Sequence, residues 1–204
     1  MFTGLIREMG SVKSFSGNRL SLQAKHKAKL GDSIAINGTC LSVVSIESDG
    51  FTVELSPETL NHIATEKLTG NVHIEPAMMM GDRFEGHIVQ GHIDTIGTVT
   101  SITNTGNSYD VLIAIDPEFI PLIPPKGSIA IDGVSLTVND VMKETFRLTI
   151  IPITMRETLF GSYKKGTRVN IETDMFARYM RHILTTSRQK DLSWNDVERI
   201  SALY

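Results

Sequence analysis

The stretch Gly31 to Val43 reads GDSIAINGTCLSV, and a near-copy of it, KGSIAIDGVSLTV, runs from Lys126 to Val138. The run Ser-Ile-Ala-Ile is identical in the two copies, and an Asn-Gly or Asp-Gly pair follows each. A match of this length does not arise from composition; it indicates an internal repeat. We therefore interpret the chain as one module encoded twice.

Each copy has the pattern of a tight β-hairpin. Two short runs of β-branched and apolar residues flank Asn37-Gly38 or Asp132-Gly133, and such pairs suit the two positive-φ positions of a type I′ turn. A two-residue loop sets the register, so we expect Ile131 to face Val134, with the next pairs following outward in order.

Opposed residues point to the same side of a sheet, so each hairpin should have one apolar face and one small, hydroxyl-bearing face. The second face comprises Ser33, Ala35, Cys40 and Ser42 in the first copy, and Ser128, Ala130, Ser135 and Thr137 in the second. A solvated face is one interpretation. This face carries no Lys or Glu, and it carries the chain's single cysteine, so we favour a ligand site on it instead.

The bulk properties narrow the class of protein. A chain of 204 residues with a repeat predicts two small domains. A net charge of −3 gives no electrostatic signal for nucleic acid, and no stretch approaches the ~20 apolar residues of a membrane span. One cysteine excludes an internal disulfide and fits the reducing cytoplasm, and no signal peptide is recognisable.

Short alternating runs separated by turn residues predict a mainly β protein. We expect two similar Greek-key β-barrels followed by a C-terminal helical tail, with boundaries at 1–86, 87–174 and 175–204. Strands are expected at 19–23, 50–55, 70–75, 108–115, 146–151 and 168–174, and short helical segments at 56–60, 117–123 and 152–158.

The tail has no counterpart in the first copy. From 175 to about 188 its apolar residues follow a helical stripe, which comprises Phe176, Tyr179, Met180, Ile183 and Leu184. A second helix could begin at Ser193 and carry Trp194, Val197 and Ile200. The stripe could pack on its own barrel or on other subunits, and its aromatic and Met content favours subunits.

His92 is the strongest single candidate for chemistry. It aligns with Leu5 of the first copy, and histidine can act as acid and base near neutral pH. His87 fits a structural role better, Cys40 could be a small buried residue, Asp174 could cap a helix, and Lys126 could be solvated. The cysteine and histidine spacing predicts no metal site, and no phosphate-binding glycine loop is present.

Four motifs, in order along the whole chain, carry a family resemblance: Met1 to Gly4, Asn37 to Val43, Gly86 to His92, and Asp132 to Val138. With them the chain resembles the riboflavin synthase family. The resemblance implies a transferase that dismutates two 6,7-dimethyl-8-ribityllumazine molecules into riboflavin and 5-amino-6-ribitylaminouracil, by four-carbon transfer and without cofactor or metal. It also implies a homotrimer joined by the C-terminal helices, whose active site lies between the N-terminal barrel of one subunit and the C-terminal barrel of another.

The resemblance implies roles for particular residues. His92 and Thr137 would assist proton transfer at the C-terminal barrel, Ser135 would position the pteridine, Cys40 would touch the acceptor, and Asp174 would bind polar groups of the substrate. The implied substrate-binding residues are Thr3, Gly4, Leu5, Ile6, Ser33, Cys40, Leu41, Ser42, Glu54, Leu55, Ser56, Pro57, Glu58, Thr59, Gly91, His92, Ile93, Lys126, Ser135, Leu136, Thr137, Ile151, Pro152, Ile153, Thr154, Met155 and Arg156.

Two alternatives remain. One is a non-catalytic lumazine- or flavin-binding protein of the same two-barrel plan, and the other is an oligomeric scaffold without a ligand. The intact set of His92, Ser135 and Thr137 favours the enzyme.

Overall fold

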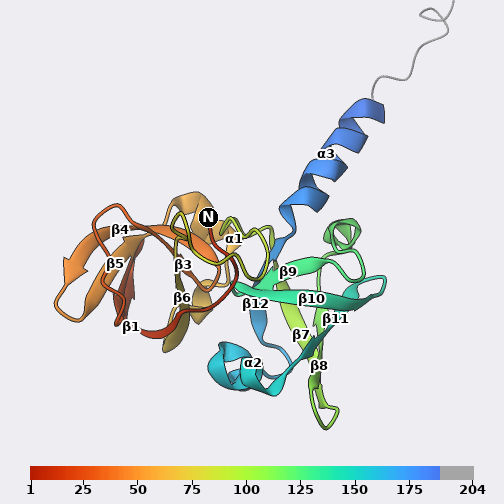
Figure 1. The fold of residues 1–204 in the computed structure, drawn as a ribbon, viewed down its shortest axis with the longest axis horizontal. Coiled ribbons are helices and arrows are strands. Elements are labelled where there is room, and N and C mark those ends of the chain that lie inside the picture. The colour runs from red at the N-terminus through yellow and green to blue at the C-terminus, as the bar shows by residue number, and fades with distance from the viewer. Residues whose placement is uncertain (189–204) are drawn as a thin grey trace, which may run out of the picture.

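The computed structural model describes residues 1–188, which form two closed β-barrels beside each other and one protruding helix (Figure 1). The first barrel contains β1 (Glu8–Ser16), β2 (Arg19–Gln23), β3 (Ser33–Ile36), β4 (Thr39–Glu47), β5 (Gly50–Glu54) and β6 (Asn71–Pro76). The second contains β7 (Thr95–Asn104), β8 (Tyr109–Ala114), β9 (Ser128–Ile131), β10 (Val134–Val141), β11 (Thr145–Ile150) and β12 (Arg168–Thr173).

The two barrels have the same topology. Strands follow each other around the first barrel in the order β1-β2-β5-β4-β3-β6, and the second repeats this order with β7-β8-β11-β10-β9-β12. Every strand pairing is antiparallel. The predicted fold class, with its internal duplication, is confirmed.

The two hairpins have the predicted turns and register. Asn37 and Asp132 both have a φ of 45°, and Gly38 and Gly133 follow with φ of 81° and 83°. Ile131 faces Val134 and the pairing continues outward as expected, in both copies. The turns also touch each other, because a Cβ on Gly38 would lie 2.5 Å from the backbone nitrogen of Gly133.

The small face of each hairpin is buried at its alanine, while Ser42 and Thr137 at its outer end are exposed. Ala35 and Ala130 are 3% and 1% exposed, and they form a core between the barrels with Phe2 and Val89. Phe2 and Val89 pair as an isolated antiparallel bridge. Each barrel has its own larger core as well.

The leading segments of the two copies are exchanged between the barrels. Ile6, from the first copy, packs against the core of the second barrel, and Ile93 packs against the core of the first. The segment at residues 2–6 therefore lies on the C-terminal barrel, and the segment at residues 89–93 lies on the N-terminal barrel. This exchange decides which residues meet in the cavities described below.

The helices are short apart from the last. They are α1 (Pro57–His62), η1 (Thr65–Lys67), η2 (Pro117–Leu122), α2 (Pro152–Glu157), η3 (Leu159–Ser162) and α3 (Met175–Arg188). Ser56 caps α1 by accepting a hydrogen bond from the Thr59 N–H, as predicted. The predicted segment at 117–123 is a 3₁₀ helix, and Pro121 inside it removes a donor that an α-helix would need.

Helix α3 projects away from the barrels (Figure 1). The side chains of its apolar stripe, Phe176, Tyr179, Met180, Ile183 and Leu184, are between 53% and 61% exposed. The stripe therefore does not pack on its own barrel. The second helix expected from Ser193, with Trp194, Val197 and Ile200, lies outside the described residues. None of the described helices has the length and apolarity needed to cross a bilayer.

Candidate active site

The N-terminal barrel opens into a cavity of ≈ 430 Å³ at the point where β4 begins and α1 follows β5. The cavity is lined by Thr39, Cys40, Ser56, Glu58, Thr59, His62, Ile63, Gly91, His92, Ile93 and Asp94. The residues from 91 to 94 belong to the second copy. The cavity is therefore completed by the exchanged segment.

This geometry corrects the expectation for His92. The family resemblance implied a role for it at the C-terminal barrel with Ser135 and Thr137, but it lines the N-terminal cavity with Cys40. The reason is the close backbone contact beside it. The Cys40 N–H donates to the Gly91 carbonyl at 2.9 Å, and a Cβ on Gly91 would lie 2.5 Å from the Cys40 Cβ.

A second cavity of ≈ 420 Å³ opens in the C-terminal barrel. It is lined by Gly86, Ser128, Ser135, Leu136, Thr137, Asn139, Thr149, Ile150, Ile151 and Thr154. Here the first copy supplies the exchanged neighbour, since the Ser135 N–H donates to the Gly4 carbonyl at 2.7 Å. The lining sets of the two cavities have no residue in common.

His87 does not line the C-terminal cavity, but it contacts Ser135, which does. Its Nδ1 lies 2.7 Å from the Ser135 hydroxyl oxygen, and the side chain is buried. Burial lowers the pKa of His87, which favours the neutral imidazole. Its Nε2 has no hydrogen-bond partner among the described residues. The sequence interpretation gave His87 a structural role, and its place in the Gly86 to His92 motif was the signal that could have suggested more.

Two matched glutamates hold the exchanged segments. Glu75 on β6 accepts hydrogen bonds from the Thr3 N–H at 2.8 Å and the Gly4 N–H at 3.1 Å. Glu172 on β12 accepts from the backbone N–H groups of Gln90, Gly91 and His92 at 2.7, 2.8 and 3.1 Å.

Burial raises the pKa of both carboxyls, Glu75 and Glu172, and the backbone donors oppose that rise. The sequence reading missed both residues. The signal was available, because a glutamate ends the same apolar pattern in each matched strand, at 72–75 and at 169–172.

Cys40 is a half-buried free cysteine at the N-terminal cavity. Burial raises the pKa of its thiol, so the neutral thiol dominates near pH 7. A thiol in this state can contact or hydrogen-bond a bound heterocycle. It is not activated as a nucleophile.

The other predicted residues differ in how close they come to a cavity. Leu41 and Leu55 are buried in the N-terminal core, and Asp174 accepts the Phe176 N–H at the start of α3, as a helix cap does. Neither cavity lining includes Thr3, Gly4, Leu5, Ile6, Ser33, Ser42, Glu54, Pro57, Lys126, Pro152, Ile153, Met155 or Arg156. The implied substrate-binding residues did not include Thr39, His62, Ile63, Asp94, Gly86, Ser128, Asn139, Thr149 and Ile150, which do line the cavities.

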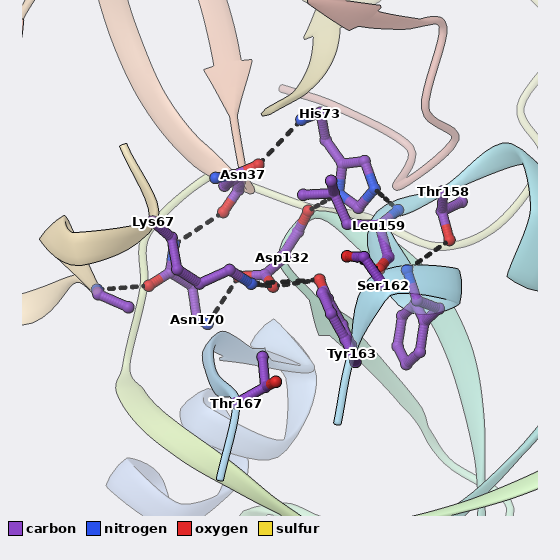
Figure 2. A network of polar contacts seen from close by, with 12 residues as sticks. Asn37, Lys67, His73, Asp132, Thr158, Leu159, Ser162, Tyr163, Thr167 and Asn170 are labelled. Carbon is purple, nitrogen blue, oxygen red and sulfur yellow. Dashed lines mark hydrogen bonds and ion pairs between the residues drawn. The ribbon is translucent and has the colours of Figure 1, made fainter. Parts of the chain in front are cut away.

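A buried polar network connects the two barrels (Figure 2). The Asp132 carboxylate is fully buried and accepts from the Lys67 ammonium, the Tyr163 hydroxyl and the Asn170 N–H. Lys67 comes from the first copy, so this ion pair crosses the barrel interface. His73 bridges the barrels as well: its Nδ1 lies 2.8 Å from the Asp132 carbonyl oxygen, and its Nε2 accepts the Leu159 N–H at 2.8 Å.

No group of three His, Cys, Asp or Glu side chains within residues 1–188 is arranged to hold a metal ion. The polar groups at the two cavities are a thiol, hydroxyls, an amide, carboxylates and imidazoles. This donor set suits hydrogen bonding to a polar heterocycle and proton transfer to or from it.

Comparison with known proteins identifies the fold and the repeat. The model of the lumazine binding domain matches residues 3–77 and again residues 90–174. Solved structures of LumP are similar in fold. The riboflavin complex superposes with a TM-score of 0.78 at 25% identity, and the complex with 6,7-dimethyl-8-(1′-D-ribityl)lumazine with a TM-score of 0.76 at 24%. In both cases 85% of this chain and 99% of the other are covered.

Curated relatives match over nearly the full chain. Riboflavin synthase of Actinobacillus pleuropneumoniae is 42% identical, with 90% of each chain covered, and that of Bacillus subtilis is 38% identical with the same coverage. Riboflavin synthase of Photobacterium phosphoreum is 37% identical over 94% of this chain and 92% of its own. With two lumazine binding domains and relatives at this identity, the chain belongs to the riboflavin synthase family.

Proposed function

We propose that this protein is a riboflavin synthase, a transferase that converts two molecules of 6,7-dimethyl-8-ribityllumazine into riboflavin and 5-amino-6-ribitylaminouracil. The single observation that carries the proposal is the pair of similar cavities built by the repeat, each at the small polar face of its hairpin: Cys40 lines the first, and Ser135 and Thr137 line the second. Each cavity binds one lumazine in this proposal: one at the barrel within residues 1–86, completed by residues 91–94, and one at the barrel within residues 87–174, with Gly86 in its lining. A reaction between two identical molecules calls for two such cavities.

The chemistry requires a proton to leave the C7 methyl group of one lumazine, and the resulting carbanion is delocalised into the pteridine ring. The other lumazine is then open to attack, and four carbons pass to it. Holding two heterocycles face to face supplies much of the rate through proximity. The protein must position the rings and move protons, and the family reaction uses no cofactor.

The two cavities offer different groups for these tasks. In the N-terminal cavity His92 is exposed to the ligand space beside Cys40, so it can take or return a proton. In the C-terminal cavity the hydroxyls of Ser135 and Thr137 can hydrogen-bond the ring or relay a proton, and the neutral His87 supports the Ser135 hydroxyl from outside the lining. Asp174 and Lys126 would bind ribityl or ring polar groups across a subunit boundary.

The active protein in this proposal is a homotrimer in the cytoplasm. The two cavities of one chain share no lining residue, and in this proposal the two rings that react with each other are bound by neighbouring chains. A neighbouring chain can bring its C-terminal cavity to the N-terminal one. The exposed stripe of α3 supports such an association, because a helix face of this apolar character is rarely left in water.

The alternative is a lumazine- or flavin-binding protein without turnover, which the similarity in fold to LumP keeps in view. Purified protein mixed with 6,7-dimethyl-8-ribityllumazine separates the two functions. The enzyme consumes two lumazines for each riboflavin that appears, which is followed by the flavin's absorbance and fluorescence. Saturable binding without flavin formation would favour the binding protein, and neither signal would favour a scaffold.

Thr137→Val tests the C-terminal cavity with almost no change in side-chain volume. It removes a hydroxyl that lines the cavity. We expect turnover to fall while lumazine still binds, because the hydroxyl acts on the reacting ring and does little for the fold. Turnover equal to that of the unmodified protein would assign the proton transfer elsewhere.

A further inference from the structure

The first turn of α3 is tied to the segment that carries His92. Arg178 donates from Nη1 to the Asp94 carboxylate at 2.9 Å and from Nη2 to the Gln90 side-chain oxygen at 2.7 Å. Its Nη2 also lies 3.5 Å from the Glu172 carboxylate. One guanidinium therefore contacts both ends of the segment at residues 90–94 and the glutamate that clamps its backbone.

The surroundings shield this contact from solvent and add further hydrogen bonds to it. The side chains of Arg178, Asp94 and Glu172 are 21%, 14% and 2% exposed, so solvent screens the charges little. The other oxygen of Asp94 accepts both the N–H and the hydroxyl of Thr173 at 2.7 Å. Asp94 thus joins the end of β12, the start of α3 and the cavity segment.

The first copy has no equivalent of this cluster. Its clamp Glu75 holds Thr3 and Gly4 through backbone and hydroxyl donors, and Arg7 occupies the position that matches Asp94. Among the described residues, no arginine ion pair reaches Glu75. The arginine is therefore specific to the segment that completes the N-terminal cavity.

We propose that Arg178 is a positioning residue that holds the segment at 90–94, and with it His92, against Cys40 in the N-terminal cavity. Through this residue the orientation of α3 determines the shape of that cavity. The inference deepens the proposed function, on which its catalytic meaning rests. It has a readout that does not depend on turnover.

Cys40 provides that readout. It is the single cysteine of the chain, it lines the N-terminal cavity, and its backbone contacts Gly91. The rate at which iodoacetamide alkylates the ligand-free protein therefore reports how firmly the segment at 90–94 covers Cys40. Protection of Cys40 by added 6,7-dimethyl-8-ribityllumazine reports occupancy of this cavity alone.

The matched control is Arg181, one turn further along α3. Its Nη1 donates to the Glu118 carbonyl at 2.9 Å, so it anchors the helix to η2 without touching the cavity segment. Ile183→Asp is a second control, which alters association through the apolar stripe and leaves Arg178 in place. Arg178→Lys keeps the charge but loses the forked geometry that reaches Asp94 and Gln90 together.

We expect iodoacetamide to alkylate Cys40 about tenfold faster in the Arg178→Ala variant than in the unmodified protein. We also expect the variant to need an about tenfold higher lumazine concentration to protect Cys40. Both effects follow because the charge-assisted hydrogen bonds of Arg178 are lost. The alkylation rate of Arg178→Lys should fall between those two, and the rate of Arg181→Ala should match that of the unmodified protein.

Equal alkylation rates of Arg178→Ala and the unmodified protein would overturn the inference. So would Arg181→Ala or Ile183→Asp reproducing the full effect, because helix anchoring or association would then be the cause. If the unmodified protein neither binds nor converts lumazine, the proposed function fails, while the ligand-free alkylation rates still decide the role of Arg178.

Discussion

The two barrels share a backbone plan but differ in the side chains placed on it. Strand order, turn geometry and glutamate clamp are the same in both. At matched positions of the two copies, however, His92 replaces Leu5, Asp132 replaces Asn37, and Asn170 replaces His73. Backbone geometry after a duplication is retained because hydrogen bonds and glycine conformations require it. Polar side chains at the barrel interface and cavities can diverge, so substitutions at these matched positions separate the reaction from the fold.

The largest effect is expected at His92 and its counterpart Leu5. His92→Ala removes the imidazole from the N-terminal cavity, and we expect turnover to fall by about 10²–10⁴-fold, the usual contribution of a general acid–base group. Steady-state flavin formation measures this. Leu5→Ala is the control for the matched position and should reduce turnover far less. Undiminished turnover of His92→Ala would remove the proton-transfer role.

The second effect concerns the buried ion pair between Lys67 and Asp132. Asp132→Asn gives the second hairpin the amide that Asn37 gives the first, but it leaves the Lys67 ammonium, which is 14% exposed, without its carboxylate. We expect the free energy of unfolding to fall by about 3 kcal/mol, as for other buried pairs that lose one partner. Urea denaturation measures the loss.

The double variant Lys67→Met with Asp132→Asn is the control for that loss. It removes both charges and should recover most of the stability, because no unpaired charge remains buried. A double variant as unstable as Asp132→Asn alone would show that the hydrogen bonds from Tyr163 and Asn170, rather than the charge pair, stabilise the interface.

The third effect concerns the close backbone contact between an exchanged segment and a hairpin, which both copies have. Gly91 has a φ of +80°, and a Cβ there would lie 2.5 Å from the Cys40 Cβ. Gly106 has a similar φ of +93° with nothing within 4 Å. Gly106→Ala should cost about 1 kcal/mol from backbone strain alone. Gly91→Ala should cost about 2 kcal/mol more, from overpacking at the exchanged contact. Equal losses in thermal unfolding would mean that the contact at Cys40 is loose.

Much of the fold follows from sequence because its determinants are local. The Asn-Gly and Asp-Gly turns, the alternation of short strands and the Ser-Pro helix start each depend on neighbouring residues. The two long strands β1 and β7 were missed. Each contains a β-bulge, at Val12/Ser14 and at Val99/Ser101, and a bulge breaks the alternation by which a strand is recognised.

The candidate site was less predictable, because its residues meet through the exchange of two segments. Nothing in the local sequence says that residues 89–93 lie on the first barrel, so the expectation put His92 beside the second hairpin, whereas it lies beside the first. His87 was underestimated for a related reason. Its partner Ser135 lies far along the chain, and only the folded backbone brings the two within 2.7 Å.

The smallest effect is a pH dependence of the free energy of unfolding, which His73 contributes and its counterpart Asn170 does not. Burial lowers the pKa of His73 to about 4, well below the ~6.5 of the unfolded chain. The unfolded state therefore binds a proton more readily, so the stability that the neutral imidazole contributes is complete above pH ~6.5 and is lost as pH falls toward about 4. Between pH 6.5 and 5.5 the free energy of unfolding should drop by about 1 kcal/mol through this group.

His73→Asn tests this contribution. It keeps one donor and one acceptor at the position, as Asn170 does when it bonds the Asn37 carbonyl and the Ala64 N–H, but it cannot titrate. Urea denaturation of both proteins at the two pH values isolates the imidazole, because every other titrating group is common to them. Parallel pH profiles would contradict the prediction. Steeper loss in the unmodified protein would mean that the neutral His73, which bonds the Asp132 carbonyl and the Leu159 N–H across the interface, contributes the stability that is lost in acid.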